Sequence, residues 1–287
     1  MRARTYFHDY LIRRAQRNEM ELNMIKAIAF DMDGIFLNSN NDYDRERFDR
    51  YYDLLTKKDI KIIVASGNQY YQLKSFFPKQ YREITFLSEN GAIVTSNEKM
   101  TPISHFENDV VQSIIAGFSN DNEKLEFALC GVKNAYLLKN SSKNFKDFAK
   151  KYYYNLEEVE NFDTLPEDTF VKIALEVSPI ITNKVVLKVR KKYGEYVEVV
   201  SSGHGSIDIV IPGINKGTTL NSLLSDWEIS KDEILVFGDS NNDIEMLSLT
   251  KNSYAMENAN NLVKQIAVHL APSNDNSGVM EIIKSFL

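Results

Sequence analysis

Four short apolar runs, each ending abruptly in polar residues, constrain the fold of this 287-residue chain more than any other feature. They are IKAIAF before Asp31, IKIIVA before Ser66, ITFL before Ser88, and ILVF before Gly238. Runs of this kind indicate strands covered on both faces, as in a parallel sheet. Ligands of open α/β sheets bind beyond the carboxyl ends of the strands. We therefore expect the four polar strand ends to line one crevice.

Helical patterns lie between and after these runs, as an α/β sheet with crossover connections requires. Residues 44 to 57 carry one apolar face, and a second helix after residue 215 repeats the spacing. The two faces consist of Phe48, Tyr51, Tyr52 and Leu55, and of Leu220, Leu223, Leu224 and Trp227. The alternation predicts an α/β fold.

The stretch from 97 to 212 has a different pattern, with short adjacent strand-like runs separated by three helical segments. This pattern favours a largely antiparallel α+β module inserted into a core formed by residues 24 to 96 and 213 to 287. Both connections lie near the ligand edge, so the module is placed to cover the crevice as a lid. Residues 1 to 23 are interpreted as a dispensable extension, with Met24 as an alternative start.

Composition argues against several classes of protein. The net charge of −6 argues against a nucleic-acid surface, and no run reaches the eighteen or so apolar residues of a membrane helix. The single cysteine, Cys130, has no partner for an intrachain disulfide, and the N-terminus lacks the apolar core of a secretion signal. We expect a cytoplasmic protein, monomeric or weakly homo-oligomeric, without nucleic-acid or membrane partners.

Two aspartates separated by one residue follow the first run. Side chains alternate along an extended strand, so Asp31 and Asp33 can point to one spot while Met32 points away. Such a pair attracts a divalent cation, although a plain strand-to-loop turn is the alternative on this segment alone. A calcium loop does not fit, because its required ligand, glycine and glutamate positions hold Ile35, Phe36 and Asp42.

Two further segments offer partners for an anion. Ser66, Gly67 and Asn68 present a hydroxyl, an unhindered backbone N–H and an amide, although SGN is by itself an ordinary turn. Lys216 stands at the start of the helix that carries Leu220, where a cation opposes the helix dipole. A bound anion would explain a lysine there, and a solvated surface lysine is the alternative.

The segment GDSNND, residues 238 to 243, follows the last of the four runs. Helix capping explains one Asp, Ser or Asn, but five stand here in succession. Asp239 is positioned to complete a Mg²⁺ site with Asp31 and the backbone carbonyl of Asp33. Asn242 is then placed to donate to the anion, and Asp243 to orient Lys216 or the metal shell.

The ordered set DMDG, SGN, a lysine at a helix start and GDSNND resembles the four motifs of the haloacid dehalogenase-like phosphatases. The position of the insertion resembles that of the Cof-type subgroup, and VASGNQYYQLKSFFP, SENGA, SGHGSIDIVIPG and GDSNNDIEML are similar to bacterial sugar phosphatases. The resemblance covers about residues 24 to 287. Two positions depart from it: Ile35 replaces the usual threonine after DxDG, and Asn68 stands where many relatives carry arginine.

This resemblance implies a Rossmann-like parallel-sheet core with an inserted α+β cap of the C2 type. It also implies Mg²⁺-dependent hydrolysis of small sugar phosphates, such as hexose and pentose phosphates. Asp31 would attack phosphorus to form an aspartyl-phosphate, and Asp33 would act as acid and then as base. Phosphate would be bound by Ser66, Gly67, Lys216 and Asn242, and Mg²⁺ by Asp31, the Asp33 backbone carbonyl and Asp239.

Substrate choice is expected to lie in the lid and beside the third strand. Gly131 and His204 lie in loops that permit close approach of a sugar, and both loops are equally compatible with ordinary turns. Glu89 and Asn90 follow the third strand, where the hydroxyls of a sugar would be read. Pyridoxal phosphate and FMN are further candidate substrates.

Three alternatives compete with hydrolysis. A phosphate-accepting regulatory domain also uses a strand-end aspartate and Mg²⁺, but needs neither Asp33 nor a large lid. A phosphomutase keeps the same groups and returns the phosphate to sugar instead of water, which the sequence leaves open. A nucleotide-binding protein is not supported, because neither GxxxxGK[ST] nor GxGxxG is present.

Overall fold

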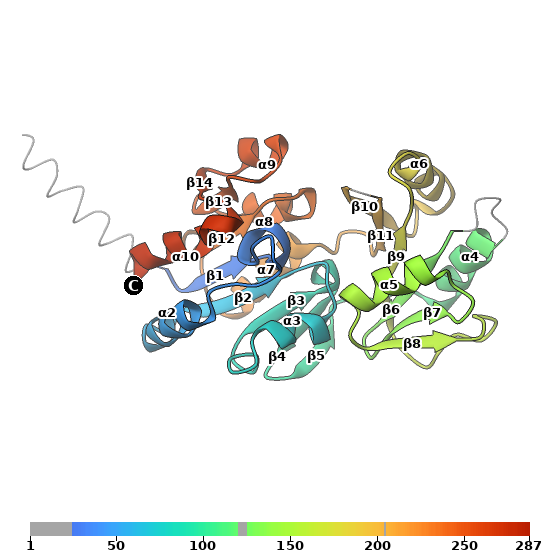
Figure 1. Ribbon diagram of the computed structural model, residues 1–287, viewed down its shortest axis with the longest axis horizontal. Helices are drawn as coiled ribbons and strands as arrows, with labels where there is room; N and C mark the ends of the chain where they lie inside the picture. Colours follow the sequence, from blue (N-terminus) through green and yellow to red (C-terminus); the bar gives the residue numbers. More distant parts are fainter. Residues whose placement is uncertain (1–24, 120–124, 204) are drawn as a thin grey trace, which may run out of the picture.

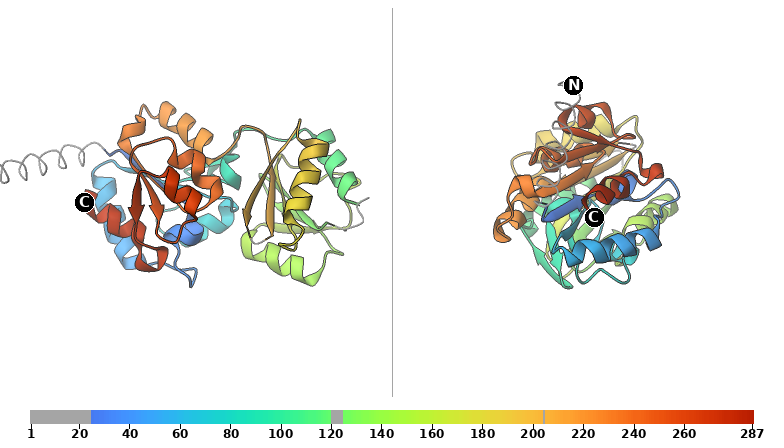
Figure 2. Two further views of the ribbon diagram at one scale, coloured as in Figure 1. Left: turned by 90° about the horizontal axis from the view of Figure 1, so that it is seen from above. Right: turned by 90° about the vertical axis from the view of Figure 1, so that its left-hand side faces the viewer.

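The computed structural model describes residues 25–119, 125–203 and 205–287. The interpretations of residues 1 to 23, of Met24 as a start and of His204 as a sugar contact therefore lie outside the described residues. The described chain forms two lobes that lie side by side, each built around its own sheet (Figures 1 and 2). We call the larger lobe the core and the smaller one the cap.

The core sheet has eight strands in the order β14-β13-β12-β1-β2-β3-β4-β5. Strands β14 to β3 are parallel, whereas β4 and β5 pair antiparallel at the edge. Their bounds are β1 Ala27–Phe30, β2 Lys61–Ala65, β3 Thr85–Ser88, β4 Ile93–Ser96, β5 Lys99–Pro102, β12 Ile234–Gly238, β13 Ser253–Met256 and β14 His269–Ala271.

The four apolar runs of the sequence form four neighbouring strands, β12, β1, β2 and β3. Phe30 at the end of β1 lies opposite Phe237 of β12 and Val64 of β2, so the polar residues that follow these strands emerge at one edge. All four residues of β1 are buried, which shows that both faces of the sheet are covered. The expected α/β class with a parallel-sheet core is confirmed.

Core helices pack the predicted apolar faces against this sheet. Phe48, Tyr52 and Leu55 of α2 are buried, as are Leu220 and Leu224 of α7, and the remaining predicted face residues are partly buried against the same apolar cluster. The helices are α2 Arg45–Lys57, α3 Tyr70–Phe76, α7 Lys216–Asp226, α8 Ile244–Leu247, α9 Asn261–Ile266 and α10 Gly278–Ile283.

The cap holds a six-stranded sheet in the order β10-β11-β9-β6-β7-β8. Its pairs are antiparallel except for β7 with β8. The strands are β6 Phe127–Gly131, β7 Ala135–Leu138, β8 Leu156–Val159, β9 Phe170–Glu176, β10 Glu198–Gly203 and β11 Ser206–Val210; the helices are α4 Asn108–Ser119, α5 Lys143–Tyr152 and α6 Thr182–Tyr193. No helix within the described ranges is long and apolar enough to cross a membrane.

The two faces of the cap sheet are used differently. Helices α4 and α6 contribute Ile114 and Val189 to a cluster with alternate strand residues such as Ile173. Helix α5 packs Phe145 against the opposite face, beside Ala128. That second face is covered only in part by α5, and the rest of it is turned toward the core.

The boundary expected at residue 96 is too early. Strand β5, Lys99–Pro102, pairs with β4 in the core sheet, so the core extends at least to Pro102. The physical reason is a tight hairpin at Asn97 and Glu98, both of which have positive φ. The charged residues Glu98 and Lys99 resemble a linker in sequence, yet they form a turn and the start of an edge strand.

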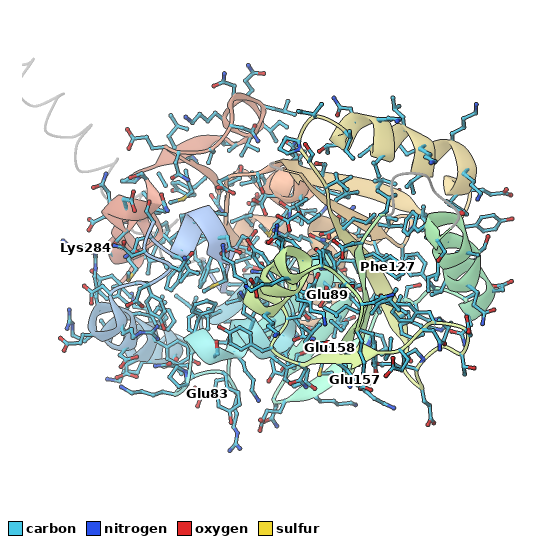
Figure 3. The ribbon with its side chains drawn as sticks, turned by 45° about the vertical axis from the view of Figure 1, so that its right-hand side comes forward. Glu83, Glu89, Phe127, Glu157, Glu158 and Lys284 are labelled. Carbon is cyan, nitrogen blue, oxygen red and sulfur yellow. The ribbon has the colours of Figure 1, made fainter. Side chains whose placement is uncertain are left out.

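Glu89 lies deep in the molecule, whereas the other labelled charged residues of the core, Glu83 and Lys284, lie at its periphery (Figure 3). Its side chain follows β3 and is 1% exposed. A charged residue at such a place requires a partner.

Candidate active site

The DMDG segment forms a turn directly after β1. Strand β1 ends at Phe30, and residues Met32–Phe36 make one irregular helical turn that is capped by Asp31. Met32 is fully buried, while Asp31 and Asp33 both line a cavity at the strand ends. The two carboxylates therefore face the same cavity, but they do so from a turn and not from the extended strand that the spacing predicts.

Lys216 is a buried partner of Asp31. It is the first residue of α7, it is 0% exposed, and its Nζ lies 2.5 Å from Asp31 Oδ2 and 2.7 Å from Asp243 Oδ1. The solvated-surface alternative is thereby excluded. Lys216 lies behind Asp31 and not among the residues that line the cavity.

Asp243 connects Lys216 to the GDSNND turn. Its second carboxylate oxygen, Oδ2, accepts hydrogen bonds from the backbone N–H groups of Asp239 and Ser240, at 3.0 and 3.1 Å. Asp243 is therefore a capping residue and a partner of the buried lysine at the same time. Its two carboxylate oxygens serve these two purposes separately.

Burial changes the ionisation of Asp31 and Asp239. Desolvation raises the pKa of Asp31 to about 6 against the opposing effect of Lys216. It raises the pKa of Asp239 to about 7, with further contributions from the charges of Asp243 and Asp31. Lys216 is held protonated, because the two aspartates outweigh the cost of its burial and raise its pKa. The site has more negative charge than Lys216 alone neutralises.

This excess of carboxylate fits a divalent cation. Asp31 and Asp239 are hard oxygen donors of the kind that Mg²⁺ prefers, and a cation would favour their ionised forms. Gly34 has φ +72°, and a Cβ there would lie 2.3 Å from Asp239 Oδ2, so glycine lets this carboxylate approach the DMDG turn. Within the described ranges, no group of three or more metal-ligating side chains occurs. The predicted Mg²⁺ site does not require such a group, because its ligands are two carboxylates and one backbone carbonyl.

The SGN loop supplies a partner for Asp33. Asn68 donates from Nδ2 to Asp33 Oδ2 at 2.6 Å, and both residues line the cavity. Ser66 and Gly67 line it as well, and Ser66 is almost completely buried. The sequence predicts that the Asn68 amide donates to a bound anion. In the structure it donates instead to Asp33, the proposed acid and base.

Asn242 lines the cavity but already has partners on both ends of its amide. It donates to Asn90 Oδ1 at 3.1 Å and accepts from Ser240 Oγ at 2.6 Å. Donation to a phosphate therefore requires that the bond to Asn90 be exchanged.

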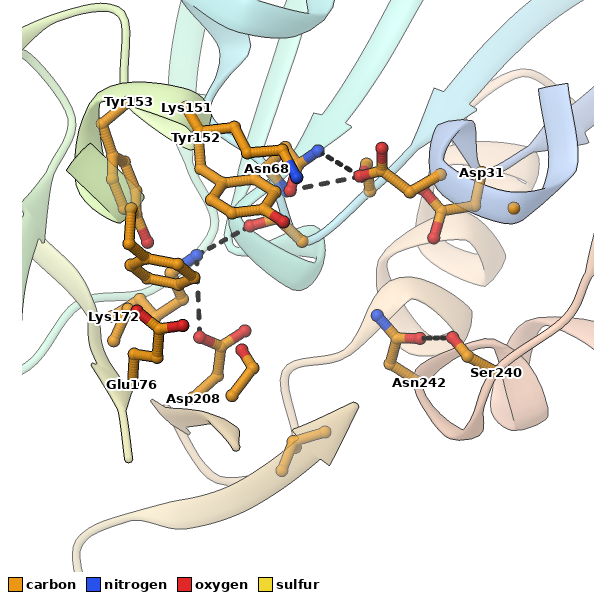
Figure 4. Close-up of a pocket in the computed structure, with 18 of the residues that line it drawn as sticks. Asp31, Asn68, Lys151, Tyr152, Tyr153, Lys172, Glu176, Asp208, Ser240 and Asn242 are labelled. Carbon is orange, nitrogen blue, oxygen red and sulfur yellow. Dashed lines mark hydrogen bonds and ion pairs between the residues drawn. The ribbon is translucent and has the colours of Figure 1, made fainter. Parts of the chain in front are cut away.

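Core and cap together enclose a cavity of about 680 Å³ (Figure 4). Alternation along β9 determines the cap wall, because Lys172, Ala174 and Glu176 face the cavity while Val171 and Ile173 pack into the cap. The remaining cap residues of the lining are Phe148, Lys151, Tyr152, Tyr153, Val200, Ser206 and Asp208. The cap wall is thus both charged and aromatic.

Three of the expected sugar contacts, Glu89, Asn90 and Gly131, are not among the residues that line the cavity. Glu89 and Asn90 are buried behind the cavity wall, and Gly131 faces Asp168, whose Oδ2 would lie 2.3 Å from an added Cβ. The cap residues that do line the cavity went unrecognised in the sequence. Their signal is visible in FVKIALEV and SIDIVI, where Lys172, Glu176 and Asp208 interrupt otherwise apolar strands.

The fold and the site together define an α/β enzyme in which a buried aspartate–lysine pair lies beneath an inserted cap. Residues 28–283 match the model of one family, described as haloacid dehalogenase-like hydrolase. The chain belongs to this family, within which it is a Cof-type phosphatase that hydrolyses phosphoric monoesters.

Individual relatives resemble the chain over almost their whole length. It is 41% identical to 5-amino-6-(5-phospho-D-ribitylamino)uracil phosphatase YbjI of Escherichia coli K12, covering 92% of this chain and 96% of the relative. It is 26% identical to the phosphatase YwtE of Bacillus subtilis, named for the same substrate, with 92% and 98% covered. The crystal structure of SMU.1108c from Streptococcus mutans UA159 superimposes with a TM-score of 0.86 at 38% identity, covering 91% and 98%.

Proposed function

We propose that this phosphatase hydrolyses phosphate esters of small sugars and sugar-like polyols, with Mg²⁺, through an aspartyl-phosphate on Asp31. The buried Asp31–Lys216 pair beneath a cavity with a charged and aromatic cap wall carries this proposal. The cavity volume of about 680 Å³ lies in the range of small-molecule sites, and the cap wall offers groups that can select the leaving group.

In the first step, Asp31 attacks phosphorus in line, and the bond between phosphorus and the sugar oxygen breaks as the aspartyl–phosphorus bond forms. Asp33 donates its proton to the departing oxygen, so that a neutral alcohol leaves. In the second step Asp33 takes a proton from the water that attacks the aspartyl-phosphate, which releases inorganic phosphate and regenerates Asp31. Asn68 holds the Asp33 carboxyl toward the cavity by the hydrogen bond described above.

The other groups of the site offset charge. Lys216 neutralises part of the charge on Asp31 as the anionic substrate approaches, and Ser66 and the Gly67 N–H are placed to donate to phosphate oxygens. Asp31, Asp239 and the backbone carbonyl of Asp33 would hold Mg²⁺. The bound cation supplies charge that favours approach of the phosphate and stabilises the transferring group.

Two of the relatives are named for 5-amino-6-(5-phospho-D-ribitylamino)uracil, a planar ring joined to a phosphorylated five-carbon chain. The cap wall offers Phe148 and Tyr152, whose ring centroids lie 5.1 Å apart on α5, beside charged groups. A phosphate-release screen should therefore compare this compound with hexose and pentose phosphates, pyridoxal phosphate and FMN. Phosphate release from none of them would refute the proposed substrate class.

The first prediction concerns the nucleophile. Asp31→Asn should reduce phosphate release to the uncatalysed background while the protein stays folded, because an amide cannot form the phosphorylated intermediate. Phosphate release and circular dichroism measure the two parts. Wild-type activity in a freshly purified variant, with deamidation excluded by mass spectrometry, would contradict the assignment.

The second prediction concerns the proton donor. Asp33→Asn should lower kcat/KM by about 10²-fold or more for a sugar phosphate, whose alkoxide leaving group needs a proton. The loss should be much smaller for p-nitrophenyl phosphate, whose phenolate leaves without one. Equal losses for both substrates would show that Asp33 has another role.

A phosphomutase would use the same groups. The two activities differ in their product, because a mutase returns the phosphate to sugar. Accumulation of free phosphate in proportion to enzyme and time supports hydrolysis, whereas an isomeric sugar phosphate formed without free phosphate would favour the mutase.

A further inference from the structure

A second buried lysine, Lys172, reaches from the cap into the active-site wall. It lies on β9, is 2% exposed, and its Nζ donates to the backbone carbonyl oxygen of Gly67 at 2.7 Å. Figure 4 shows its side chain lying between Tyr153 and Asp208. No step of the proposed chemistry uses this cation.

Carboxylates from both lobes balance the charge of Lys172. Glu89 Oε2 lies 2.6 Å from Nζ and is 1% exposed, whereas Asp208 of the cap lies 3.9 Å away. Its ammonium is also 5.4 Å from the ring centroid of Tyr153. These anions raise the pKa of Lys172 well above its ordinary value, despite the cost of burial, so the cation is permanent.

The hydrogen bond to Gly67 connects this cation to the phosphate-binding loop. The Gly67 carbonyl belongs to the peptide unit whose N–H is that of Asn68, and this N–H donates to Ser66 Oγ at 3.4 Å. A cation on a peptide oxygen fixes the plane of the peptide and polarises its N–H, which strengthens it as a donor. Backbone hydrogen bonds from Glu89 and Asn90 to the carbonyls of Asn68 and Ser66 hold the same loop.

We infer that Lys172 is a positioning residue for phosphate binding, acting from the cap through the 67–68 peptide of the core. The loop is complete as an anion site only when the cap is docked and Lys172 is seated between Gly67 and Glu89. This inference rests on the proposed function insofar as it assigns the loop to phosphate. In this role Lys172 does not contact the leaving group, because its hydrogen-bonded partner is the Gly67 carbonyl of the loop itself.

The test needs a variant that removes the cation without leaving a buried charge. Lys172→Met together with Glu89→Gln makes both partners neutral. The matched control is Lys146→Met with Glu158→Gln, since Lys146 also pairs with a glutamate at 2.5 Å and donates to a backbone carbonyl, that of Lys139, at 2.6 Å. That pair lies within the cap and outside the cavity lining.

Three measurements are made on each protein: thermal unfolding, the affinity for inorganic phosphate in the presence of Mg²⁺ by calorimetry, and kcat/KM for p-nitrophenyl phosphate and a sugar phosphate. The neutral pair at 172 and 89 should remain folded, bind inorganic phosphate about tenfold more weakly, and lose a similar factor in kcat/KM for both substrates. The control pair should leave phosphate affinity and both kcat/KM values unchanged.

A loss confined to the sugar phosphate would overturn the inference, because it would make Lys172 a contact of the leaving group. Unchanged phosphate affinity would overturn it as well. Lys172→Arg, which keeps a cation beside Glu89, should retain more phosphate affinity than the neutral pair, and an equal loss in both would count against the inference. If the wild type hydrolyses no ester, the proposed function fails, and the calorimetry still decides the role of Lys172.

Discussion

At the scale of single residues, Asp239 opposes folding at neutral pH in the absence of a cation. Its pKa is raised in the folded protein, so folding favours the protonated form and the folded state binds more protons than the unfolded one. Ionisation of Asp239 in the folded protein therefore lowers the stability of the fold progressively as pH rises from about 4 to about 7. Above pH 7 this destabilisation is fully present.

The third prediction follows from this sign. Without metal, Asp239→Asn should be more stable than the wild type at pH 8 by about 1–2 kcal/mol, allowing for the partial exposure of the side chain, and no more stable at pH 4. Urea unfolding at the two pH values measures the difference. Added Mg²⁺ should stabilise the wild type more than the variant, because the variant lacks one proposed ligand. Greater stability of the wild type without metal at pH 8 would contradict the electrostatic account.

Residues that carry motif chemistry were predictable, and those that act across the two lobes were not. Asp31, Asp33, Ser66, Gly67, Asp239 and Asn242 follow strand ends in the sequence, and the parallel sheet gathers such ends at one edge. Lys172 lies in the middle of an apolar cap strand, and Glu89 is 83 positions away from it in the sequence. Their contact depends on how the cap docks, which local patterns do not encode.

At the scale of elements, the start of α7 sets the position of the buried lysine. Asn215 caps the helix: its side chain accepts from the Thr218 N–H at 2.8 Å, and the Thr218 hydroxyl accepts from the Asn215 N–H at 3.0 Å. The next residue is Lys216. The N-terminal capping of α7 by Asn215 thus determines the direction in which the Lys216 side chain leaves the backbone, toward Asp31.

The fourth prediction compares two helix caps. Asn215→Ala and Asn260→Ala should each cost about 1 kcal/mol of stability, because each side chain caps a helix by accepting a backbone N–H. Only Asn215→Ala should also lower kcat, since α7 begins with Lys216, whose Nζ lies 2.5 Å from Asp31 Oδ2. Thermal unfolding and phosphate release measure both. Equal activity in the two variants would mean that helix capping by Asn215 does not position Lys216.

Strands with a clear apolar pattern were predictable, whereas polar edge strands were not. β8, with the sequence LEEV, is partly exposed along its whole length, and β5, with the sequence KMTP, has three exposed residues of four. An edge strand gains its hydrogen bonds from one neighbour and buries little side-chain area, so its composition resembles that of a loop. Both strands lie at sheet edges, which explains why the sequence left them out.

At the scale of the whole molecule, a few polar contacts hold the cap on the core beside the SGN loop. Gln69 donates to the carbonyl oxygen of Asn155 and accepts from its N–H, both at 2.9 Å, and Gln72 donates to the carbonyl oxygen of Lys151 at 3.0 Å. The larger apolar cluster lies within the core, whereas the cap cluster also includes Ala92 and Ile93 of the core. Beside the SGN loop, however, the docking contacts are hydrogen bonds.

The fifth prediction tests this docking. Gln69→Ala removes both hydrogen bonds to Asn155, so the backbone amide of Asn155 should exchange faster with deuterium, and KM for a sugar phosphate should rise several-fold. Asn252→Ala removes one hydrogen bond within the core, to the carbonyl oxygen of Asp232, and should change neither quantity. Unaltered exchange at Asn155 in the first variant would show that other contacts hold the cap.

The pairing of Lys172 with Glu89 also restricts how such proteins can be recombined. A cap transplanted from a relative that lacks the lysine would leave Glu89 buried without its cation. A core that lacks the glutamate would leave Lys172 buried without this anion. The two positions must change together in any viable chimera. Although the cap is a separate lobe, it is not a freely exchangeable part, and substrate range in this lineage is expected to diversify by replacements around Lys172 more readily than by exchange of whole caps.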